Sequence, residues 1–244
     1  MRIFYLLLAM LSFFSYVAEA QNSSGINKKW YRSDAGDFCL FSFSNVSRDG
    51  NQLKNIPRFI YLNSTSHFNK DITQSVGFFT GYSINNIGMI YDENDSVRYK
   101  RRVITFGLSA GLKFGNIKEA TYFFLEGQLN MAVNYKEKRF VNDKKVDKSN
   151  TWFGEQTPLL MPAVSAGFLY NQIGIKAQYF PTNFFNPAYV KDGVQPFKGM
   201  EAQILSVSIT YDFKRSQKSK TKKTGSRMES GASSEEQLSE HLPH

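Results

Sequence analysis

Residues 205–213 alternate large apolar side chains with small or polar ones without a break, in the order Leu-Ser-Val-Ser-Ile-Thr-Tyr-Asp-Phe. Successive side chains of a β-strand point to opposite faces, so this segment predicts a strand with one apolar and one polar face. A soluble sheet would bury the apolar face in a core. A membrane barrel would turn it to lipid and turn the polar face to the lumen.

Eight segments carry this kind of pattern, and most have about the 9–11 residues that cross a bilayer at a tilt. In segment 103–114 every second residue from Ile104 to Phe114 is apolar, and the residues between them are small or polar. In segment 173–180, Lys176 and Gln178 fall on the face opposite to Ile175. The predicted strands are Phe38–Val46, Phe59–Phe68, Ser75–Ile84, Val103–Phe114, Tyr122–Tyr135, Ala163–Tyr170, Ile173–Phe180 and Ile204–Phe213.

The connections between these segments alternate in length. Only Asn171-Gln172 joins the sixth and seventh strands, whereas long polar stretches at 85–102, 136–162 and 181–203 follow the third, fifth and seventh. Bacterial outer-membrane barrels have short periplasmic turns, long outer loops and an even number of strands. The sequence therefore predicts an all-β fold, an antiparallel up-and-down transmembrane β-barrel of about eight strands, with both chain ends on the periplasmic side.

Aromatic residues gather near both predicted ends of the strands, as expected for belts at the two membrane interfaces. Aromatic residues are also good strand formers, so the belts alone are weak evidence. The predicted outer group is Tyr91, Tyr99, Tyr135 and Trp152, and the inner group is Tyr122, Phe123, Tyr170, Tyr211 and Phe213.

The N-terminus has the pattern of a secretory signal peptide, with Arg2, an apolar run from Ile3 to Val17 and the small residues Ala18 and Ala20. An uncleaved anchor is the alternative, but the run is shorter than the roughly 20 residues of a spanning helix. The expected domains are 1–20, the signal peptide; 21–35, an N-terminal periplasmic segment; 36–213, the barrel; and 214–244, a disordered tail.

The tail 214–244 is basic in its first half, acidic in its second and almost free of large apolar side chains. It cannot bury enough apolar surface to offset the entropy of ordering, so we expect disorder. The chain carries a net charge of +9, but secretion removes nucleic acid as a partner. A solvated tail, or contact with anionic headgroups or acidic envelope polymers, is expected instead.

The chain resembles the small outer-membrane β-barrels of Bacteroidota, the OmpA-like or "porin family" barrels with PorT-type relatives. The likeness covers about residues 36–213 and rests on Ile56-Pro57-Arg58-Phe59, the run Gly77–Gly88, Tyr99-Lys100-Arg101-Arg102 and the closing aromatic strand. It implies a location and a fold more than an activity. The end of that strand, Tyr211 and Phe213, resembles the signal read by the barrel-assembly machinery, although here the tail follows it.

Charged side chains on the polar faces are expected to fill the lumen, because eight strands enclose a space that side chains just fill. A buried charge without a partner is costly. We expect Lys113 to pair with Glu126 and Lys176 with Asp212, as a plug rather than a proton relay.

A basic rim is expected where the fourth and fifth strands meet their outer loops. Arginine and lysine suit phosphate, so the rim fits the phosphates of lipopolysaccharide in the outer leaflet. The alternative is a solvated rim with Asp92, Glu93, Asp95 and Glu137 as counterions. The predicted rim residues are Arg98, Lys100, Arg101, Arg102, Lys136, Lys138 and Arg139.

No catalytic motif is visible in the sequence. His67, beside Ser64–Ser66, forms no recognisable triad, and no metal, cofactor or phosphate-loop motif is present. We therefore expect no enzymatic activity and no cofactor. Two functions remain: a structural or accessory outer-membrane barrel that binds lipid or an envelope protein through its loops or tail, and a narrow channel or transporter for small or hydrophobic solutes.

Overall fold

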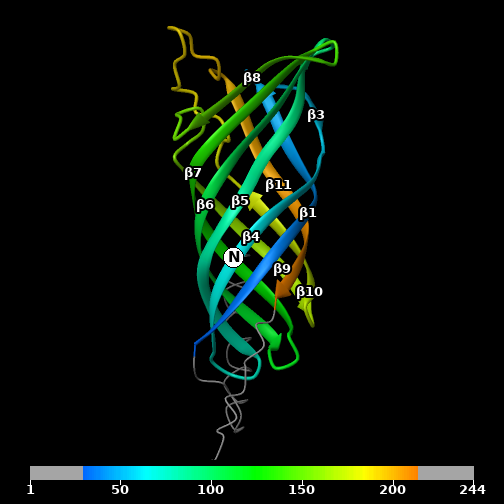
Figure 1. Cartoon of the computed structure of the whole chain (residues 1–244), viewed down its shortest axis with the longest axis vertical. Coiled ribbons are helices and arrows are strands. Elements are labelled where there is room, and N and C mark those ends of the chain that lie inside the picture. The colour runs from blue at the N-terminus through cyan, green and yellow to red at the C-terminus, as the bar shows by residue number, and fades with distance from the viewer. Residues whose placement is uncertain (1–29, 214–244) are drawn as a thin grey trace, which may run out of the picture.

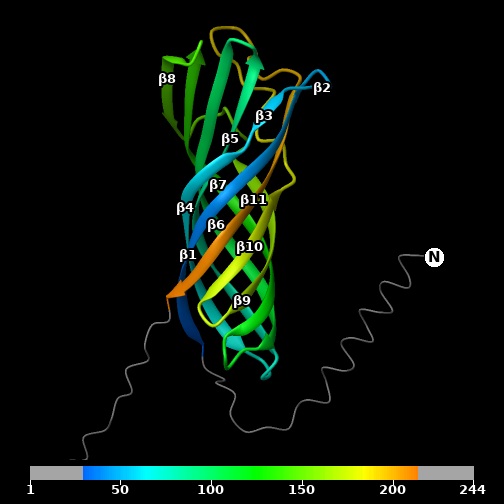
Figure 2. The same cartoon turned by 90° about the vertical axis from the view of Figure 1, so that its right-hand side faces the viewer.

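The computed structural model describes residues 30–213, which form one closed antiparallel β-sheet (Figures 1 and 2). The last strand pairs with the first from Asp34↔Phe213 to Arg48↔Met200, and this pairing closes the sheet into a barrel. The strands are β1 (Tyr31–Arg48), β2 (Asn51–Gln52), β3 (Lys54–Ile56), β4 (Arg58–Asp71), β5 (Val76–Asn94), β6 (Val97–Asn116), β7 (Thr121–Val141), β8 (Lys144–Trp152), β9 (Leu160–Tyr170), β10 (Ile173–Phe180) and β11 (Met200–Phe213).

These strands occupy eight positions around the barrel. Strands β8 and β9 both pair with β7 and share one position, and β2, β3 and β4 share another beside β1 and β5. Pro57 separates β3 from β4, because proline cannot donate a hydrogen bond to the ladder. The structure confirms the predicted all-β antiparallel barrel of about eight strands.

The barrel closes with a stagger. Following paired residues from Asp71 through Gly77 and on around the barrel leads back to β4 at Tyr61, ten residues away. Such a stagger accompanies strands that tilt relative to the barrel axis, and the tilt is visible in Figure 1.

The two ends of the barrel differ. Trp30, Phe213 and the short turns 72–75, 117–120 and 171–172 lie at one end, which we call the terminal end. At the other, the hairpin end, β5 and β6 meet in a tight turn at Asp95-Ser96, and β7 and β8 meet at Asn142-Asp143 (Figure 2).

Two of the three long loops expected from the sequence are mostly strand. Segments 85–102 and 136–162 continue β5, β6, β7 and β8, and only 181–199 remains a long loop. Charged residues made these segments look like loops, yet the strands pair far into them, as at Tyr91↔Tyr99. β1 also begins at Tyr31, inside the segment 21–35 expected to precede the barrel.

Large apolar side chains cover the outside of the barrel on every one of its eight positions. We call this surface the apolar belt. It includes Phe38 and Phe43 on β1, Phe59 and Leu62 on β4, Tyr82 and Ile84 on β5, Phe106 and Leu108 on β6, Leu125 and Leu129 on β7, Val164 and Phe168 on β9, Ile175 and Tyr179 on β10, and Leu205 and Ile209 on β11.

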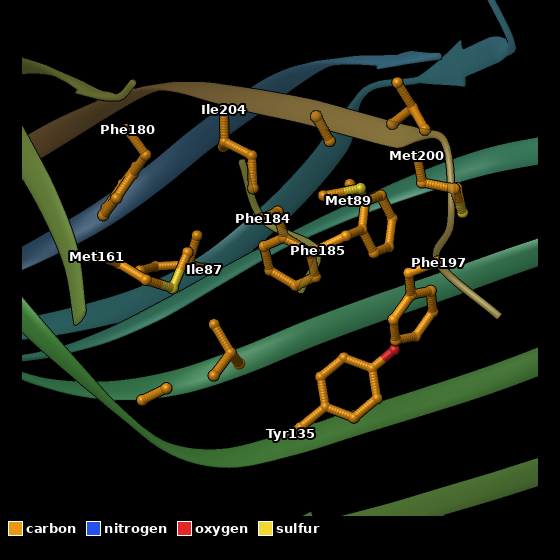
Figure 3. Close-up of a cluster of buried hydrophobic side chains, with 14 of the residues drawn as sticks. Ile87, Met89, Tyr135, Met161, Phe180, Phe184, Phe185, Phe197, Met200 and Ile204 are labelled. Carbon is orange, nitrogen blue, oxygen red and sulfur yellow. The ribbon is translucent and has the colours of Figure 1, made fainter. Parts of the chain in front are cut away.

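The lumen is filled by side chains along the described part of the barrel. Towards the terminal end, Phe79 and Phe124 pack edge to face with their ring centroids 6.4 Å apart. They are followed by a polar layer around Lys176 and Gln128. Towards the hairpin end an apolar cluster closes the lumen (Figure 3), and its buried residues include Ile87, Met89, Tyr135, Met161, Phe180, Phe184, Phe185, Phe197, Met200 and Ile204.

Loop 181–199 supplies the centre of that cluster. Phe184, Phe185 and Phe197 are buried, and the Phe184 amide donates to the Ala202 carbonyl at 2.9 Å. Asn183 fixes the loop to β11, because its side chain donates to the Met200 carbonyl and accepts from the Ala202 amide. The loop therefore folds into the barrel mouth instead of extending outward.

The predicted signal peptide 1–20 and tail 214–244 lie outside the described residues. Within residues 30–213, the structure has no helix long and apolar enough to span a membrane.

Candidate functional site

Lys176 lies at the centre of the polar layer and bonds to two buried carboxylates. Its Nζ is 3.1 Å from Glu126 Oε2 and 3.2 Å from Asp37 Oδ2. Thr210 Oγ1 donates to the other oxygen of Asp37 at 2.7 Å, and His67 Nε2 lies 3.2 Å from Glu126 Oε1. The network joins β1, β4, β7, β10 and β11 across the lumen.

The partners expected from the sequence are therefore wrong in detail. Lys176 pairs with Glu126 and Asp37 and not with the expected partner, Asp212. Glu126 was the expected partner of Lys113. Instead, Lys113 Nζ contacts Asn69 Oδ1 and lies 4.8 Å from the Tyr122 ring centroid. The barrel stagger brings strands of distant sequence together across the lumen, so neighbouring-strand register alone did not identify Asp37 or Asn69.

Towards the terminal end of the lumen, Asp37, Lys113 and Lys176 help to line a small cavity of about 30 Å³. A volume of this size in a polar setting suits about one water molecule. Above the cavity, Gln178 Nε2 donates to Gln128 Oε1 at 2.8 Å, and Asn85 Nδ2 donates to Asn130 Oδ1 at 2.7 Å. These amide pairs extend the polar layer from the charged network towards the apolar cluster.

Arg101 belongs to the lumen and not to the predicted rim. Its side chain is 6% exposed, and its Nε lies 2.7 Å from Glu137 Oε2. The guanidinium also sits 4.4 Å from the Tyr99 ring centroid and 4.8 Å from that of Phe197, both favourable cation–π distances. Arg101 thus ties β6 to loop 181–199.

Several predicted aromatic belt residues are also inside the barrel. Tyr91, Tyr122 and Tyr135 are buried, and Tyr99 stacks on Tyr91 with ring centroids 5.7 Å apart. Tyr135 faces the lumen because a β-bulge at Val133 shifts the alternation of β7 by one residue. The remaining members of the two groups, Trp152, Phe123, Tyr170, Tyr211 and Phe213, are exposed.

Four of the predicted rim residues come together on the outer face of the barrel. Lys100 is the register partner of Lys138, and Arg102 is the register partner of Lys136. They line a groove of about 210 Å³ together with Arg58 and Ile90, and with Met89 and Arg101, which are themselves buried. We call Arg58, Lys100, Arg102, Lys136 and Lys138 the basic groove.

The predicted rim did not include Arg58. The ladder between β4 and β5 ends at Ser64↔Ile84, and β3 resumes it only at Ile56↔Ile90. In this gap Arg58 donates to the Asn86 carbonyl at 3.2 Å and to Asn86 Oδ1 at 2.8 Å. Pro57, which interrupts the strand, was the available signal that a side chain would be needed here.

The other two rim residues lie apart from the basic groove. Arg98 binds Asp92 through its Nε at 2.7 Å and Asp143 at 3.1 Å. The hydrogen bond from Arg98 holds the pKa of Asp92 below its usual value. Arg139 is exposed and pairs in register with Tyr99.

Tyr211 and Phe213, the predicted assembly signal, are exposed at the end of β11 with their rings 5.0 Å apart, edge to face. His67 is held in the lumen network described above. Among residues 30–213, no cluster of three or more His, Cys, Asp or Glu side chains could hold a metal ion.

No protein-family model and no curated protein sequence matches the chain. Among solved structures, it is similar to Ail, the attachment invasion locus protein of Yersinia pestis, crystallised with the heparin analogue sucrose octasulfate. That match has 16% identity and a TM-score of 0.37 and covers 75% of this chain and 97% of Ail. Neisserial surface protein A matches with 12% identity and a TM-score of 0.38, over 76% of this chain and 99% of that protein. Likenesses this weak carry no function across.

Proposed function

We propose that the chain is a non-enzymatic bacterial outer-membrane protein, a closed barrel with a structural or accessory role that binds lipid or an envelope protein through its hairpin end. The apolar belt carries this proposal. Soluble monomers rarely expose contiguous apolar patches beyond a few hundred Å², whereas this surface surrounds the whole barrel. In lipid, a closed barrel leaves no strand edge unpaired.

The dimensions of the belt support the same location. On β6 the apolar outward positions run from Ile104 to Phe114. At about 3.3 Å per residue and a tilt of about 40°, this length corresponds to a height of about 25 Å. That is the height of the apolar band of outer-membrane barrels. The hairpins of β5–β6 and β7–β8 then rise above the membrane surface, and the short turns lie in the periplasm.

Secretion and assembly follow from this location. The predicted signal peptide 1–20 would carry the chain across the inner membrane, and the barrel-assembly machinery would recognise Tyr211 and Phe213 at the exposed end of β11. The predicted kinship with Bacteroidota barrels rests on the same residues as before, among them Pro57 and Arg58, which shape the gap between β4 and β5.

Cell fractionation tests the membrane location, and electrophoretic mobility tests the closed barrel. The full chain, expressed with its N-terminal segment, should sediment with outer membranes and resist extraction by carbonate. Unheated in sodium dodecyl sulfate, it should migrate faster than after boiling, because a closed barrel stays folded. Recovery of the mature chain as a detergent-free soluble monomer would contradict the proposal.

A narrow channel is the second candidate from the sequence, and the filled lumen argues against it. The Lys176 network and the apolar cluster around Phe184 form two obstructions in series. The purified protein should give no porin-sized current steps in planar bilayers. Stepwise currents of porin size would instead favour the channel.

A further inference from the structure

We propose that the basic groove is a binding site for the phosphate groups of an anionic lipid of the outer leaflet. This inference rests on the proposed membrane location and names the lipid chemistry that the hairpin end recognises. Three observations carry it: paired like charges, nearby carboxylates that pair with other residues within 30–213, and the height of the groove relative to the apolar belt.

The first observation is that two like-charged pairs stand next to each other on the sheet. Lys100 lies opposite Lys138, and Arg102 lies opposite Lys136. Side chains opposite each other on neighbouring strands are typically about 5 Å apart, and like charges there destabilise the sheet. Repulsion from Arg102, the largest contribution, lowers the pKa of Lys136. An anion between the pairs would remove this repulsion.

The second observation is that the nearby carboxylates are committed elsewhere. Glu137 lies next to Lys136 in the chain but pairs with Arg101, and Asp92 pairs with Arg98 and Lys54. Glu93 pairs with Arg48. Among the described residues, the five cations of the basic groove form no ion pair, and Arg102 Nε is buried without a hydrogen-bond partner. Three of the four counterions expected for a solvated rim therefore pair with residues outside the basic groove.

The third observation is the height of the groove. Arg102 lies two residues beyond Ile104, at the upper limit of the apolar belt on β6. Polar headgroups add about 5–7 Å to each side of the roughly 30 Å hydrocarbon core. Arg102 and Lys136 therefore stand at the level of lipid phosphates, and Lys100 and Lys138 stand just above them.

The shape of the groove fits a phosphate as well. Gly88 is the register partner of Arg102, and a Cβ at this position would lie only 2.9 Å from Arg102 Cα, so glycine lets β5 and β6 approach closely beside the groove. Arg58 borders the groove from the other side, with its guanidinium held by Asn86. Arginine offers two parallel donors to one phosphate, and lysine contributes a mobile point charge.

Calorimetric titration of the full chain in an uncharged sugar detergent tests the site. The probes are diphosphoryl lipid A, the same lipid without phosphates, and inorganic pyrophosphate. The double variant R102E/K136E should raise the dissociation constant for diphosphoryl lipid A by at least about tenfold. The matched variant K144E/K145E changes the net charge equally, on β8 outside the groove, and should change it less than about twofold.

Equal losses in the two variants would overturn the site in favour of a diffuse charge effect. Equal affinity for diphosphoryl and phosphate-free lipid A would overturn phosphate recognition. Pyrophosphate binding as tight as lipid A, with the same sensitivity to R102E/K136E, would identify a soluble anion as the ligand and overturn the lipid. Heat-modifiable mobility is measured on every variant, so that loss of the barrel, which would contradict the proposed membrane location, is distinguished from loss of the site.

Discussion

Lys176 illustrates how single residues hold the barrel together. It is buried between Asp37 and Glu126, which come from strands far apart in the sequence. A buried charge is stable only when its partners compensate for the lost hydration. The three side chains therefore act as a unit, and removing Lys176 leaves two buried carboxylates without their cation.

Replacement of Lys176 by methionine should lower the free energy of unfolding by about 3–5 kcal/mol, because two buried carboxylates lose their cation. Urea unfolding in phospholipid vesicles, followed by tryptophan fluorescence, measures this change. Lys118→Met, at an exposed turn position, is the control and should change stability by less than about 0.5 kcal/mol. Equal stability of the two variants would show that the lumen network is not needed.

Gly111 provides the space in which the Phe79 ring packs, towards the terminal end of the lumen. A Cβ at position 111 would overlap the ring of Phe79, whereas a Cβ at position 127 on the adjacent strand would meet only the Ala110 carbonyl oxygen, 4.0 Å away. Gly111→Ala should therefore destabilise the barrel by about 1–3 kcal/mol through overpacking. Gly127→Ala should be nearly neutral in the same unfolding measurement, and a larger loss at 127 than at 111 would contradict this packing.

At the level of elements, loop 181–199 and the strands β5, β6 and β7 form one packed mouth. Arg101 connects them, since it pairs with Glu137 of β7 and stacks near Phe197 of the loop. Without this side chain, Glu137 would lose its ion-pair partner and keep only the hydrogen bond from the Tyr135 hydroxyl, and the loop would lose a contact at Phe197.

Arg101→Ala should therefore loosen loop 181–199 while the barrel persists. Limited trypsin digestion of the folded protein measures this loosening, because Lys191 and Lys198 lie in the loop. We expect cleavage there to accelerate several-fold, because cleavage follows local opening. Arg139→Ala removes the same charge from an exposed site and should leave the rate unchanged. An unchanged rate in Arg101→Ala would show that the loop is held without it.

The strand pattern could be predicted from the sequence because outward side chains are mostly large and apolar, whereas inward side chains, which pack the lumen, are mostly small or polar. Predicted strand Ile173–Phe180 matches β10, and predicted Ala163–Tyr170 falls within β9. The extensions into 85–102 and 136–162 were missed because outward residues above the belt are charged, so the alternation there no longer contrasts apolar with polar faces.

The site was only partly predictable, for two physical reasons. Arg101 shares the alternation of Val103 and Thr105, so carrying that phase upward would have placed it in the lumen. Tyr135 could not be placed this way, because the bulge at Val133 reverses the phase and leaves no clear mark in the sequence. Contacts across the lumen, such as Asp37 with Lys176, depend on the stagger of the closed barrel.

At the scale of the whole molecule, the barrel has an apolar outside, a packed inside and charged hairpins at one end. This arrangement inverts the usual distribution of a soluble protein and suits a lipid bilayer. The basic groove lies at the boundary between the apolar belt and the charged hairpins, which is where a lipid headgroup meets both surfaces.

Accessibility of two valines to paramagnetic reagents tests the membrane location most directly. Val164 lies in the apolar belt and Val146 on β8 above it, and they are 57% and 56% exposed. Spin labels are placed at V164C or V146C in a Cys39→Ser background, in protein reconstituted into phospholipid vesicles. If lipid covers the belt, the label at 164 will collide more with oxygen than with a water-soluble nickel chelate, and the label at 146 will show the reverse. Equal access of the nickel chelate to both positions would contradict the membrane-spanning barrel.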